Sequence, residues 1–421
     1  MLPISPATLR KVGTFALSFG LSKIAAFAAA VALPRFVDTE TYGLLELAMS
    51  VASLAGGVLG LGATAFAARA FLLENDPSAR TILVGHAMVL SLVGSGLGLV
   101  LVLIGASNLL VICAGLLALF GMQSSASSYV RMHGNVTLAG WFDAIALIAL
   151  VALAASLSAV NLATAEYMAL GMLAIGLAIL VPTLRMTARI PLHELKLLLR
   201  RVIMGGTPMM LYGLAIILVF GTSRMAIGQG LGLADVAIFS VCARLTAVLL
   251  FANQIFQIGF VQYLYRLKAD SLARIFPFWT IALCVAGLVL ALVGHFSSEL
   301  IVMGTNIPAS AVAKVFPSVV VLSTLSILNA NIEMYINREL ASHQAAVSLT
   351  AISALGFVVG IVLLRLEVLS LASIVDLYSV AMGLALGVQM RILMHRGLSF
   401  GWSHLVLPMV IVPWFVRFLP A

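Results

Sequence analysis

Three cations lie inside long apolar runs of this sequence, where a charged side chain is a candidate for chemistry. Lys23 lies near the middle of the run 12–34, and Arg244 lies about nine residues into the run 235–264. Arg224 lies in the outer part of the run before it. A charge at the centre of a membrane helix costs at least about 2.5–3.5 kcal/mol, so it usually faces a cavity or a partner. Lysine and arginine at such depth can bind a compact anion through charge-assisted hydrogen bonds.

Each of these cations also has a structural explanation. The helical face of Lys23 carries small residues, which are typical of a cavity wall or of a close helix contact; they are Ala16, Gly20, Ala26 and Ala30. Arg224 is within the membrane only if its helix continues to about residue 230. A fourth candidate, Arg35, lies at the outer end of the first run, where snorkelling to the interface explains it well. The candidate anion-binding residues are therefore Lys23, Arg244, Arg224 and Arg35.

Four acids also lie within the apolar runs, namely Glu46, Asp143, Glu333 and Asp376. They could neutralise the cations in structural ion pairs, or carry protons that couple the protein's activity to a gradient. Ion pairing is the interpretation we favour for each of them. The three cysteines lie singly in separate runs, and no Cys/His cluster has the spacing of a metal site. We therefore expect no metal and no cofactor.

The elements that position these charges follow from the composition. Of the 421 residues, 62% are apolar and only 9% are charged, with a mean hydropathy of +1.17. A soluble protein carries roughly 25% charged residues, so soluble enzymes, nucleic-acid-binding domains and disordered proteins are excluded. Because a helix needs about 20 apolar residues to cross a bilayer, the sequence predicts an all-α, polytopic membrane protein.

Twelve apolar runs are long enough to be membrane-spanning helices. They are 12–34, 42–70, 81–104, 109–131, 138–158, 164–184, 202–230, 235–264, 274–296, 312–337, 344–364 and 369–392. A thirteenth apolar stretch, about 402–418, holds Pro408, Pro413 and Arg417. Two prolines in so short a stretch argue against an ordinary spanning helix, so we expect it to lie in the interface or to form an extra helix.

The chain also divides near its middle. The longest polar connection, 185–201, has apolar and basic residues at helical spacing, as in an amphipathic segment on the membrane surface; a solvated loop is an equal alternative. Each half has an acid-bearing turn before a long helix, and Tyr42-Gly43 and Val236-Ala237 correspond at a separation of 194 residues. We predict a six-helix bundle over 1–190, an amphipathic linker over 191–201, a second six-helix bundle over 202–396 and an apolar tail over 397–421.

The distribution of Lys and Arg predicts the orientation. Sixteen of them fall in loops on one side of the predicted spans and four on the other. Cytoplasmic loops carry the excess of positive charge, so both termini are expected in the cytoplasm. The same bias explains the net charge of +8, and no nucleic-acid partner is needed to account for it.

Two stretches resemble a known family. Residues 36–54 read FVDTETYGLLELAMSVASL, and residues 205–245 read GGTPMMLYGLAIILVFGTSRMAIGQGLGLADVAIFSVCARL. They are similar to bacterial polysaccharide and O-antigen flippases, in which an extended turn and a Tyr-Gly-Leu sequence precede a long helix and a proline-bearing seventh helix precedes the eighth. The resemblance covers most of residues 10–265, while residues 270–421 match only in hydropathy.

The resemblance implies the fold of the multidrug/oligosaccharidyl-lipid/polysaccharide exporter superfamily, two bundles of about six helices around a central cavity that opens to each side in turn. The implied substrate is a polyprenyl-pyrophosphate-linked oligosaccharide, moved across the bacterial cytoplasmic membrane. The implied partners are this lipid-linked glycan, membrane lipids and other polysaccharide-assembly membrane proteins. With that substrate, Lys23 and Arg244 are predicted to line one cavity and to bind the anionic headgroup together.

Two other functions remain open. An antiporter of cationic drugs has the same fold, but it would need a net acidic cavity, and the candidate residues here are mixed or basic. A membrane-embedded polysaccharide polymerase or ligase would be an enzyme of a different class. Such enzymes tend to have a large external loop with catalytic Arg or His, whereas no external loop here exceeds roughly fifteen residues. We therefore expect a transporter and not an enzyme.

Overall fold

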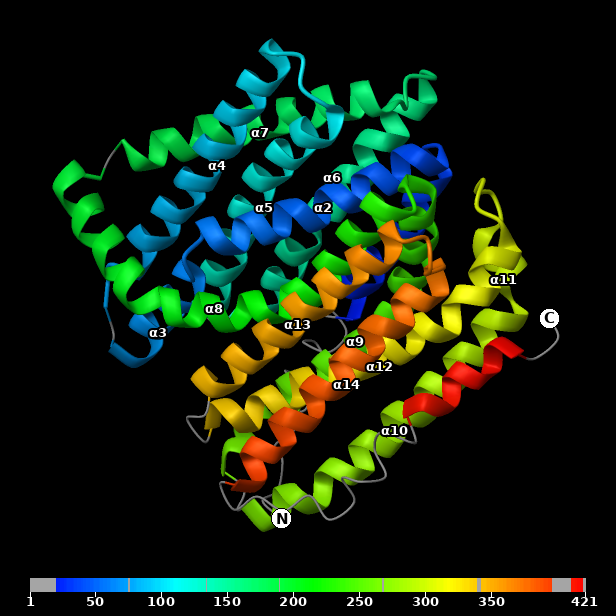
Figure 1. Ribbon diagram of the computed structural model, residues 1–421. Helices are drawn as coiled ribbons and strands as arrows, with labels where there is room; N and C mark the ends of the chain where they lie inside the picture. The colour runs from blue at the N-terminus through cyan, green and yellow to red at the C-terminus, as the bar shows by residue number, and fades with distance from the viewer. Residues whose placement is uncertain are drawn as a thin grey trace. The chain divides into compact units, whose positions relative to one another are not determined.

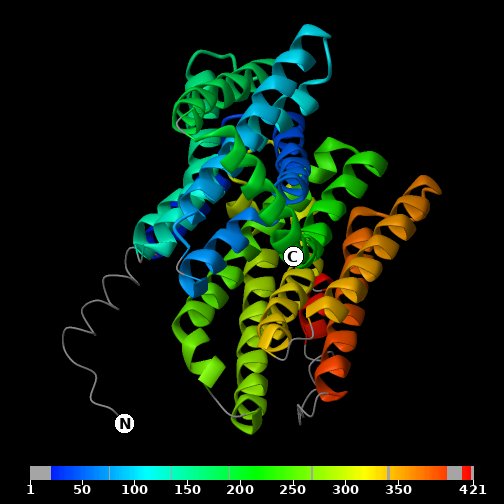
Figure 2. The same cartoon turned by 90° about the vertical axis from the view of Figure 1, so that its left-hand side faces the viewer.

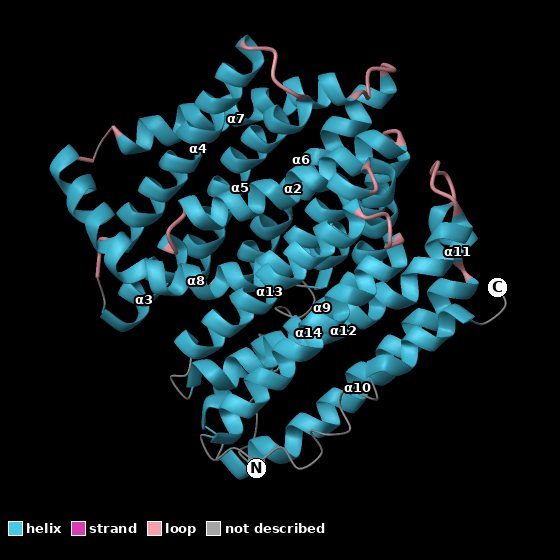
Figure 3. Ribbon diagram, in the orientation of Figure 1, coloured by secondary structure: helices cyan, strands magenta, loops and turns pink. Residues whose placement is uncertain are grey.

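The computed structural model describes residues 20–74, 76–133, 135–188, 190–266, 269–338, 342–395 and 410–418, which are almost entirely helical (Figure 1, Figure 3). No strand is assigned within these ranges. Ten helices there are long and apolar enough to cross a membrane, judged by length and composition. The protein is an all-α, polytopic membrane protein, as its hydropathy predicts.

The chain divides into two compact units. Unit 1 comprises Met1–Val37 and Ala48–Leu214, and unit 2 comprises Asp38–Leu47 and Ala215–Ala421. Helix α2 (Thr39–Leu59) contributes to both units, and so does α8 (Leu192–Gly230). The predicted linker 191–201 is thus part of a 39-residue helix, and unit 1 includes residues that the sequence assigns to the second bundle.

Unit 1 is a bundle in which glycines set the spacing of the helices. Its elements are the helical residues 20–32, η1 (Leu33–Arg35), the second part of α2, α3 (Ala63–Glu74), α4 (Ala79–Leu103), α5 (Asn108–Met132), α6 (Val136–Ala159), α7 (Ala165–Thr187) and the first part of α8. A Cβ added at Gly94 of α4 would lie 2.5 Å from the carbonyl oxygen of Ala114 in α5. One added at Gly115 would lie 2.5 Å from the carbonyl oxygen of Met172 in α7. Helices α4, α5 and α7 therefore pack with their backbones in close approach.

The predicted run 42–70 forms two helices instead of one. Helix α2 ends at Leu59, α3 begins at Ala63, and between them Leu61 and Gly62 have φ values of 48° and 68°. This left-handed conformation cannot continue a right-handed helix. Gly62 also lies against α8, because a Cβ there would be 2.3 Å from the carbonyl oxygen of Gly206.

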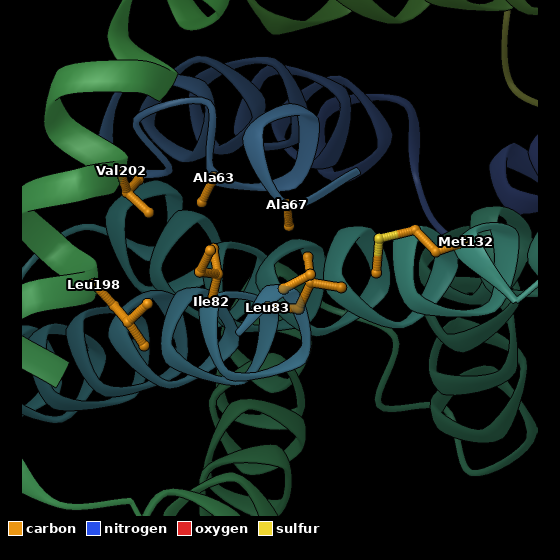
Figure 4. Close-up of a cluster of buried hydrophobic side chains, with 8 residues drawn as sticks. Ala63, Ala67, Ile82, Leu83, Met132, Leu198 and Val202 are labelled. Atoms are coloured by element: carbon orange, nitrogen blue, oxygen red, sulfur yellow. The ribbon is translucent and has the colours of Figure 1, made fainter. Parts of the chain in front are cut away.

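A cluster of buried apolar side chains holds the start of α8 on the rest of unit 1 (Figure 4). Its members are Ala63, Ala67, Ala79, Ile82, Leu83, Met132, Leu198 and Val202. Leu198 and Val202 are four residues apart and buried, whereas Lys196 and Arg200 are exposed. One face of the predicted linker therefore packs on α3 and α4, and its basic residues face outward.

An ion pair beside this cluster fixes the loop between α3 and α4. Asp76 accepts hydrogen bonds from the backbone N–H of Ser78 at 2.8 Å and from Nη2 of Arg201 at 2.7 Å. These bonds, those from Ser78 first, hold the pKa of the Asp76 carboxyl below its usual value. The loop is thereby tied to α8.

We expect the stability that Asp76 contributes to be lost at acid pH. Its folded-state pKa is below the unfolded value of about 3.9, so the contribution is complete above about pH 5 and is lost as the pH falls through the folded-state pKa. Since Arg201 is 44% exposed, Asp76→Asn should cost about 1 kcal/mol or less near neutral pH. Melting temperatures of the two proteins should converge as the pH falls through the folded-state pKa of Asp76, and a difference that is independent of pH below about pH 5 would contradict the assignment.

Unit 2 is built around α12, the most buried of its candidate spans. Its elements are the first part of α2, the last part of α8, α9 (Leu233–Arg266), α10 (Ala269–Phe296), α11 (Ser298–Val302), α12 (Ala309–Arg338), α13 (Ser342–Arg365), α14 (Leu371–His395) and η2 (Val412–Phe418). Helix α12 packs against α9, α10, α14 and η2, and α13 runs beside α14 (Figure 2). Asn329 donates to the carbonyl oxygen of Met382 at 3.1 Å and accepts from Gln389 at 3.0 Å, which joins α12 to α14.

Within the predicted tail 397–421, the structure describes residues 410–418. Most of this segment is the 3₁₀ helix η2, with Pro413 and Val416 buried. It packs against α10 and α12. This part of the tail is a short helix docked on unit 2, and residues 396–409 before it lie outside the described ranges.

Candidate functional site: buried ion clusters

The most buried charges of unit 2 form a cluster of two arginines around one glutamate. Arg244 of α9 donates from Nε to Oε1 of Glu46 at 3.1 Å and from Nη2 to Oε2 at 3.2 Å. Arg224 of α8 places Nη2 3.5 Å from the same Oε2. The Glu46 side chain is 1% exposed, compared with 12% for Arg224 and 24% for Arg244. A single buried carboxylate is thus shared by two guanidinium groups.

The neighbours of Arg224 hold it in a fixed orientation. Its Nε donates to the hydroxyl of Ser240 at 3.0 Å, and its guanidinium carbon lies 5.4 Å from the centre of the Phe239 ring. Both contacts come from α9, and a cation over an aromatic face is attracted by the ring. Arg224 therefore lies inside unit 2. It is a helix residue and not a loop residue, because α8 continues to Gly230.

The turn before α2 positions Glu46. Asp38 accepts hydrogen bonds from the N–H of Thr41 at 2.9 Å and from its hydroxyl at 2.6 Å, which caps the start of the helix. Tyr42 is fully buried. Gly43 lets α2 approach α9, because a Cβ there would lie 2.0 Å from the carbonyl oxygen of Leu233. The Asp-Thr-Glu-Thr-Tyr-Gly sequence thus brings Glu46, one turn later, to the arginines of unit 2.

The charges of this cluster do not balance. Glu46, Arg224 and Arg244 together carry a net charge of +1. Arg244 is the most exposed of the three, and its planar guanidinium can bind phosphate oxygens in pairs. The cluster is therefore suited to an anionic group that reaches Arg244.

A second cluster, which also has two cations and one carboxylate, lies in unit 1. Lys23 Nζ is 3.8 Å from Oδ2 of Asp143, and Arg131 at the end of α5 is ion-paired with the same oxygen. The hydroxyl of Ser127 donates to Oδ1 of Asp143 at 2.7 Å. The Lys23 and Asp143 side chains are 14% and 24% exposed, and that of Arg131 is 54% exposed. Here too, two cations share one carboxylate.

We expect Asp143 to matter more for stability than Lys23. Lys23→Met leaves Asp143 paired with Arg131 and Ser127, so it should cost less than about 1 kcal/mol. Asp143→Leu removes the acceptor of all three groups and leaves the ammonium of Lys23 without it, which should cost about 2–3 kcal/mol. Thermal unfolding of the purified variants measures the difference, and the double variant should recover part of the loss. Equal costs for the two single changes would contradict this account.

The third cluster joins the C-terminal segment to α14. Asp376 accepts from Nη1 of Arg417 at 2.8 Å and from Nε1 of Trp414 at 3.0 Å. The Arg417 guanidinium carbon is 3.8 Å from the centre of the Trp414 ring. This cluster has one cation for one carboxylate, so it is electrically balanced and serves to dock η2.

The predicted site residues therefore fall into separate groups. Arg224, Arg244 and Glu46 lie together in unit 2, Lys23 and Asp143 lie together in unit 1, and Asp376 pairs with Arg417. Arg35 is exposed at the end of η1, and the side chain of Glu333 lies outside the described part of the structure. The joint action of Lys23 and Arg244 on one headgroup, and the central cavity, stay predictions.

Several partners were not among the predicted residues. Arg131 is the last residue of the apolar run 109–131, and Ser127 and Ser240 are uncharged residues within runs. Trp414 and Arg417 lie in the tail. The side chains of cations at helix ends can extend along the helix by their full length. A prediction that also considered such cations would have included Arg131. Within the described ranges, no group of three or more His, Cys, Asp or Glu side chains could hold a metal ion.

No protein-family model matches this chain, and no curated protein matches its sequence. It is similar in structure to a protein described as a multidrug resistance MATE family transporter of the MOP superfamily, solved in an inward-facing conformation, with a TM-score of 0.60. The match covers 92% of this chain and 95% of that one, at 14% sequence identity. The fold agrees with the superfamily that the sequence resembles. This chain is a multi-pass membrane protein that shares the fold of that transporter.

Proposed function

We propose that this protein is a transporter that moves a polyprenyl-pyrophosphate-linked oligosaccharide across the membrane by alternating access. The observation that carries the proposal is the Glu46–Arg224–Arg244 cluster, in which two partly buried arginines share one buried carboxylate. The fold similarity to a transporter supports the general class. The resemblance of residues 36–54 and 205–245 to lipid-linked oligosaccharide flippases supports the substrate.

The physical barrier to this substrate is its headgroup. A pyrophosphate carries at least two negative charges, and moving an unpaired charge into a medium of low dielectric constant costs many kcal/mol. Arg244 can replace part of the lost hydration with two charge-assisted hydrogen bonds. Arg224, held by Ser240 and Phe239, keeps Glu46 neutralised while Arg244 turns to the substrate. Lys23 in unit 1 is the second proposed contact for the headgroup.

The location proposed for the protein follows from the same substrate. A polyprenyl-linked glycan is assembled at the bacterial cytoplasmic membrane, where the proposed partners are membrane lipids and other polysaccharide-assembly proteins. The excess of Lys and Arg, sixteen to four between the two sides, supports an orientation with both termini in the cytoplasm.

Export of cationic drugs is the second candidate, because the structurally similar protein is described as a multidrug resistance transporter. A site for a cation needs an excess of acidic groups. In the clusters around Glu46 and Asp143 the cations outnumber the carboxylates by two to one. The charge of these clusters therefore favours an anionic substrate.

Deleting the gene in its native host tests the proposal. A lipid-linked oligosaccharide should accumulate in the cytoplasmic leaflet of the deletion strain, and complementation with the wild-type gene should clear it. Sensitivity to cationic drugs is the control and should not change. Absence of any accumulated lipid-linked intermediate, together with increased drug sensitivity, would favour the antiporter and contradict the flippase.

A further inference from the structure

A groove in unit 2 is lined by none of the three residues of the Glu46–Arg224–Arg244 cluster. It is formed by α12, α14 and residues 411 and 414 near the C-terminus, and its volume is about 670 Å³. Ligand sites in proteins typically enclose about 300–1,000 Å³. Its walls are largely apolar, with Val321 and Leu325 contributed by α12. A cavity of this size and character, open along a membrane-spanning helix, is suited to an apolar ligand.

Small residues of α14 line the groove along its length. Ser379, Gly383 and Gly387 follow one another at intervals of four residues, so they lie on one face of the helix. A Cβ added at Gly387 would meet no atom within 4 Å, so there is free space over this glycine. Val380 and Leu384, which also line the groove, are 61% and 60% exposed. The groove is therefore open on the side of α14 that carries Val380 and Leu384.

The two ends of the groove differ in charge. At one end the carboxylate of Asp376 is already neutralised by Arg417 and hydrogen-bonded by Trp414. At the other end Arg391 is exposed. Within the part of the chain that the structure describes, no carboxylate is ion-paired with Arg391. The groove thus has one balanced polar end and one end with a positive charge.

The length of the groove matches one leaflet of a bilayer. At a rise of 1.5 Å per residue, Arg391 lies about 18 Å along α14 from Ser379. Gly383 is the middle residue of α14 (Leu371–His395), so Arg391 is about 12 Å from the middle of the span. The hydrocarbon core of a leaflet is about 15 Å thick, and an arginine side chain extends beyond its own Cα toward the headgroups.

We propose that this groove binds a membrane phospholipid with an anionic headgroup. One acyl chain lies over Ser379, Gly383 and Gly387, and its end approaches the Asp376–Arg417 pair. The headgroup accepts hydrogen bonds from the guanidinium of Arg391. Because Trp414 forms part of the wall, the bound lipid packs against η2 and stabilises its docking on unit 2. This site is independent of the proposed transport substrate.

Binding of phosphatidylglycerol to the purified full-length protein, counted by native mass spectrometry, tests the proposal. Wild-type protein should bind one phosphatidylglycerol more tightly than phosphatidylcholine, with a higher melting temperature in its presence. Gly387→Leu places a bulky side chain in the groove, at a position where an added Cβ meets no atom within 4 Å, and should remove this binding event. Gly96→Leu is the matched control, since Gly96 in α4 is exposed and a Cβ there also meets no atom within 4 Å.

The charge is tested separately. Arg391→Gln should weaken phosphatidylglycerol binding about tenfold, the loss expected for a charge-assisted hydrogen bond, and Arg391→Lys should retain part of it. Arg185→Gln, a change at an exposed arginine of α7, is the control and should bind as the wild type does. Unchanged binding in Gly387→Leu would overturn the proposal. Equal affinity for phosphatidylcholine, or preferential binding of undecaprenyl phosphate, would also overturn it.

Discussion

Replacing Glu46 by glutamine is expected to lower the free energy of unfolding by about 3–5 kcal/mol, the cost of removing one partner from a buried ion pair. The side chain is 1% exposed and pairs with Arg224 and Arg244. With a neutral amide in its place, two partly buried guanidinium groups lose the carboxylate that they share. Thermal unfolding of the purified protein, and its abundance in the membrane, measure the effect.

Two further variants separate this explanation from a general sensitivity of α2. Glu40→Gln changes an exposed carboxylate in the first turn of the same helix, and it should alter stability by less than about 0.5 kcal/mol. Adding Arg244→Gln to Glu46→Gln removes one of the two cations that shared the carboxylate and should recover part of the loss. Wild-type stability of Glu46→Gln would show that the arginines do not depend on the carboxylate.

Hydropathy is sufficient to place most of the helices. The predicted runs 81–104 and 109–131 correspond to α4 (Ala79–Leu103) and α5 (Asn108–Met132), and 369–392 corresponds to α14. Crossing a bilayer requires an apolar segment of set length, so the signal is local and can be read along the chain. The break between α2 and α3 at Leu61 and Gly62 does not appear in the hydropathy, because both residues are apolar. Only their backbone conformation ends α2.

The charged residues could be found from the sequence, but their partners could not. A charge within an apolar run stands out, and Glu46, Arg224 and Arg244 were all identified in this way. Which acid meets which cation depends on the packing of helices far apart in the sequence, since Glu46 and Arg244 are 198 residues apart. Arg417 and Asp376 are 41 residues apart, and no periodicity links them.

The amphipathic segment before residue 202 shows a similar limit. Its apolar and basic residues at helical spacing predict a helix with two faces, and the segment is part of α8. The sequence does not reveal that Leu198 and Val202 pack on α3 and α4, or that the helix continues without interruption to Gly230. The helix runs through Gly205, Gly206 and Pro208, residue types of low helix propensity, so its continuation has no signal in the sequence, and the domain division was based on charge and hydropathy alone.

Replacing Arg244 by glutamine is expected to reduce export of the lipid-linked oligosaccharide about 100-fold while leaving most of the stability intact. Arg244 is the proposed contact for the headgroup, and losing two charge-assisted hydrogen bonds of about 1.5 kcal/mol each changes affinity by about two orders of magnitude. Glu46 keeps Arg224, whose Nη2 is 3.5 Å from its Oε2, so no buried acid is left without a cation. Export, normalised to the amount of protein in the membrane, is the measurement.

The two members of this ion pair are expected to differ in which property their substitution affects more, export or stability. Glu46→Gln should mainly lower stability, because it raises the net charge of the three side chains from +1 to +2. Arg244→Gln should mainly lower export, because the net charge of the three side chains falls from +1 to zero.

Arg244→Lys retains the charge but not the paired hydrogen bonds, so an intermediate loss of about tenfold is expected. Arg365→Gln, at the exposed end of α13, is the control for a lost arginine. Wild-type export by a well-expressed Arg244→Gln protein would show that the headgroup does not bind at this cluster, and equal losses of stability in Glu46→Gln and Arg244→Gln would show that the pair is purely structural.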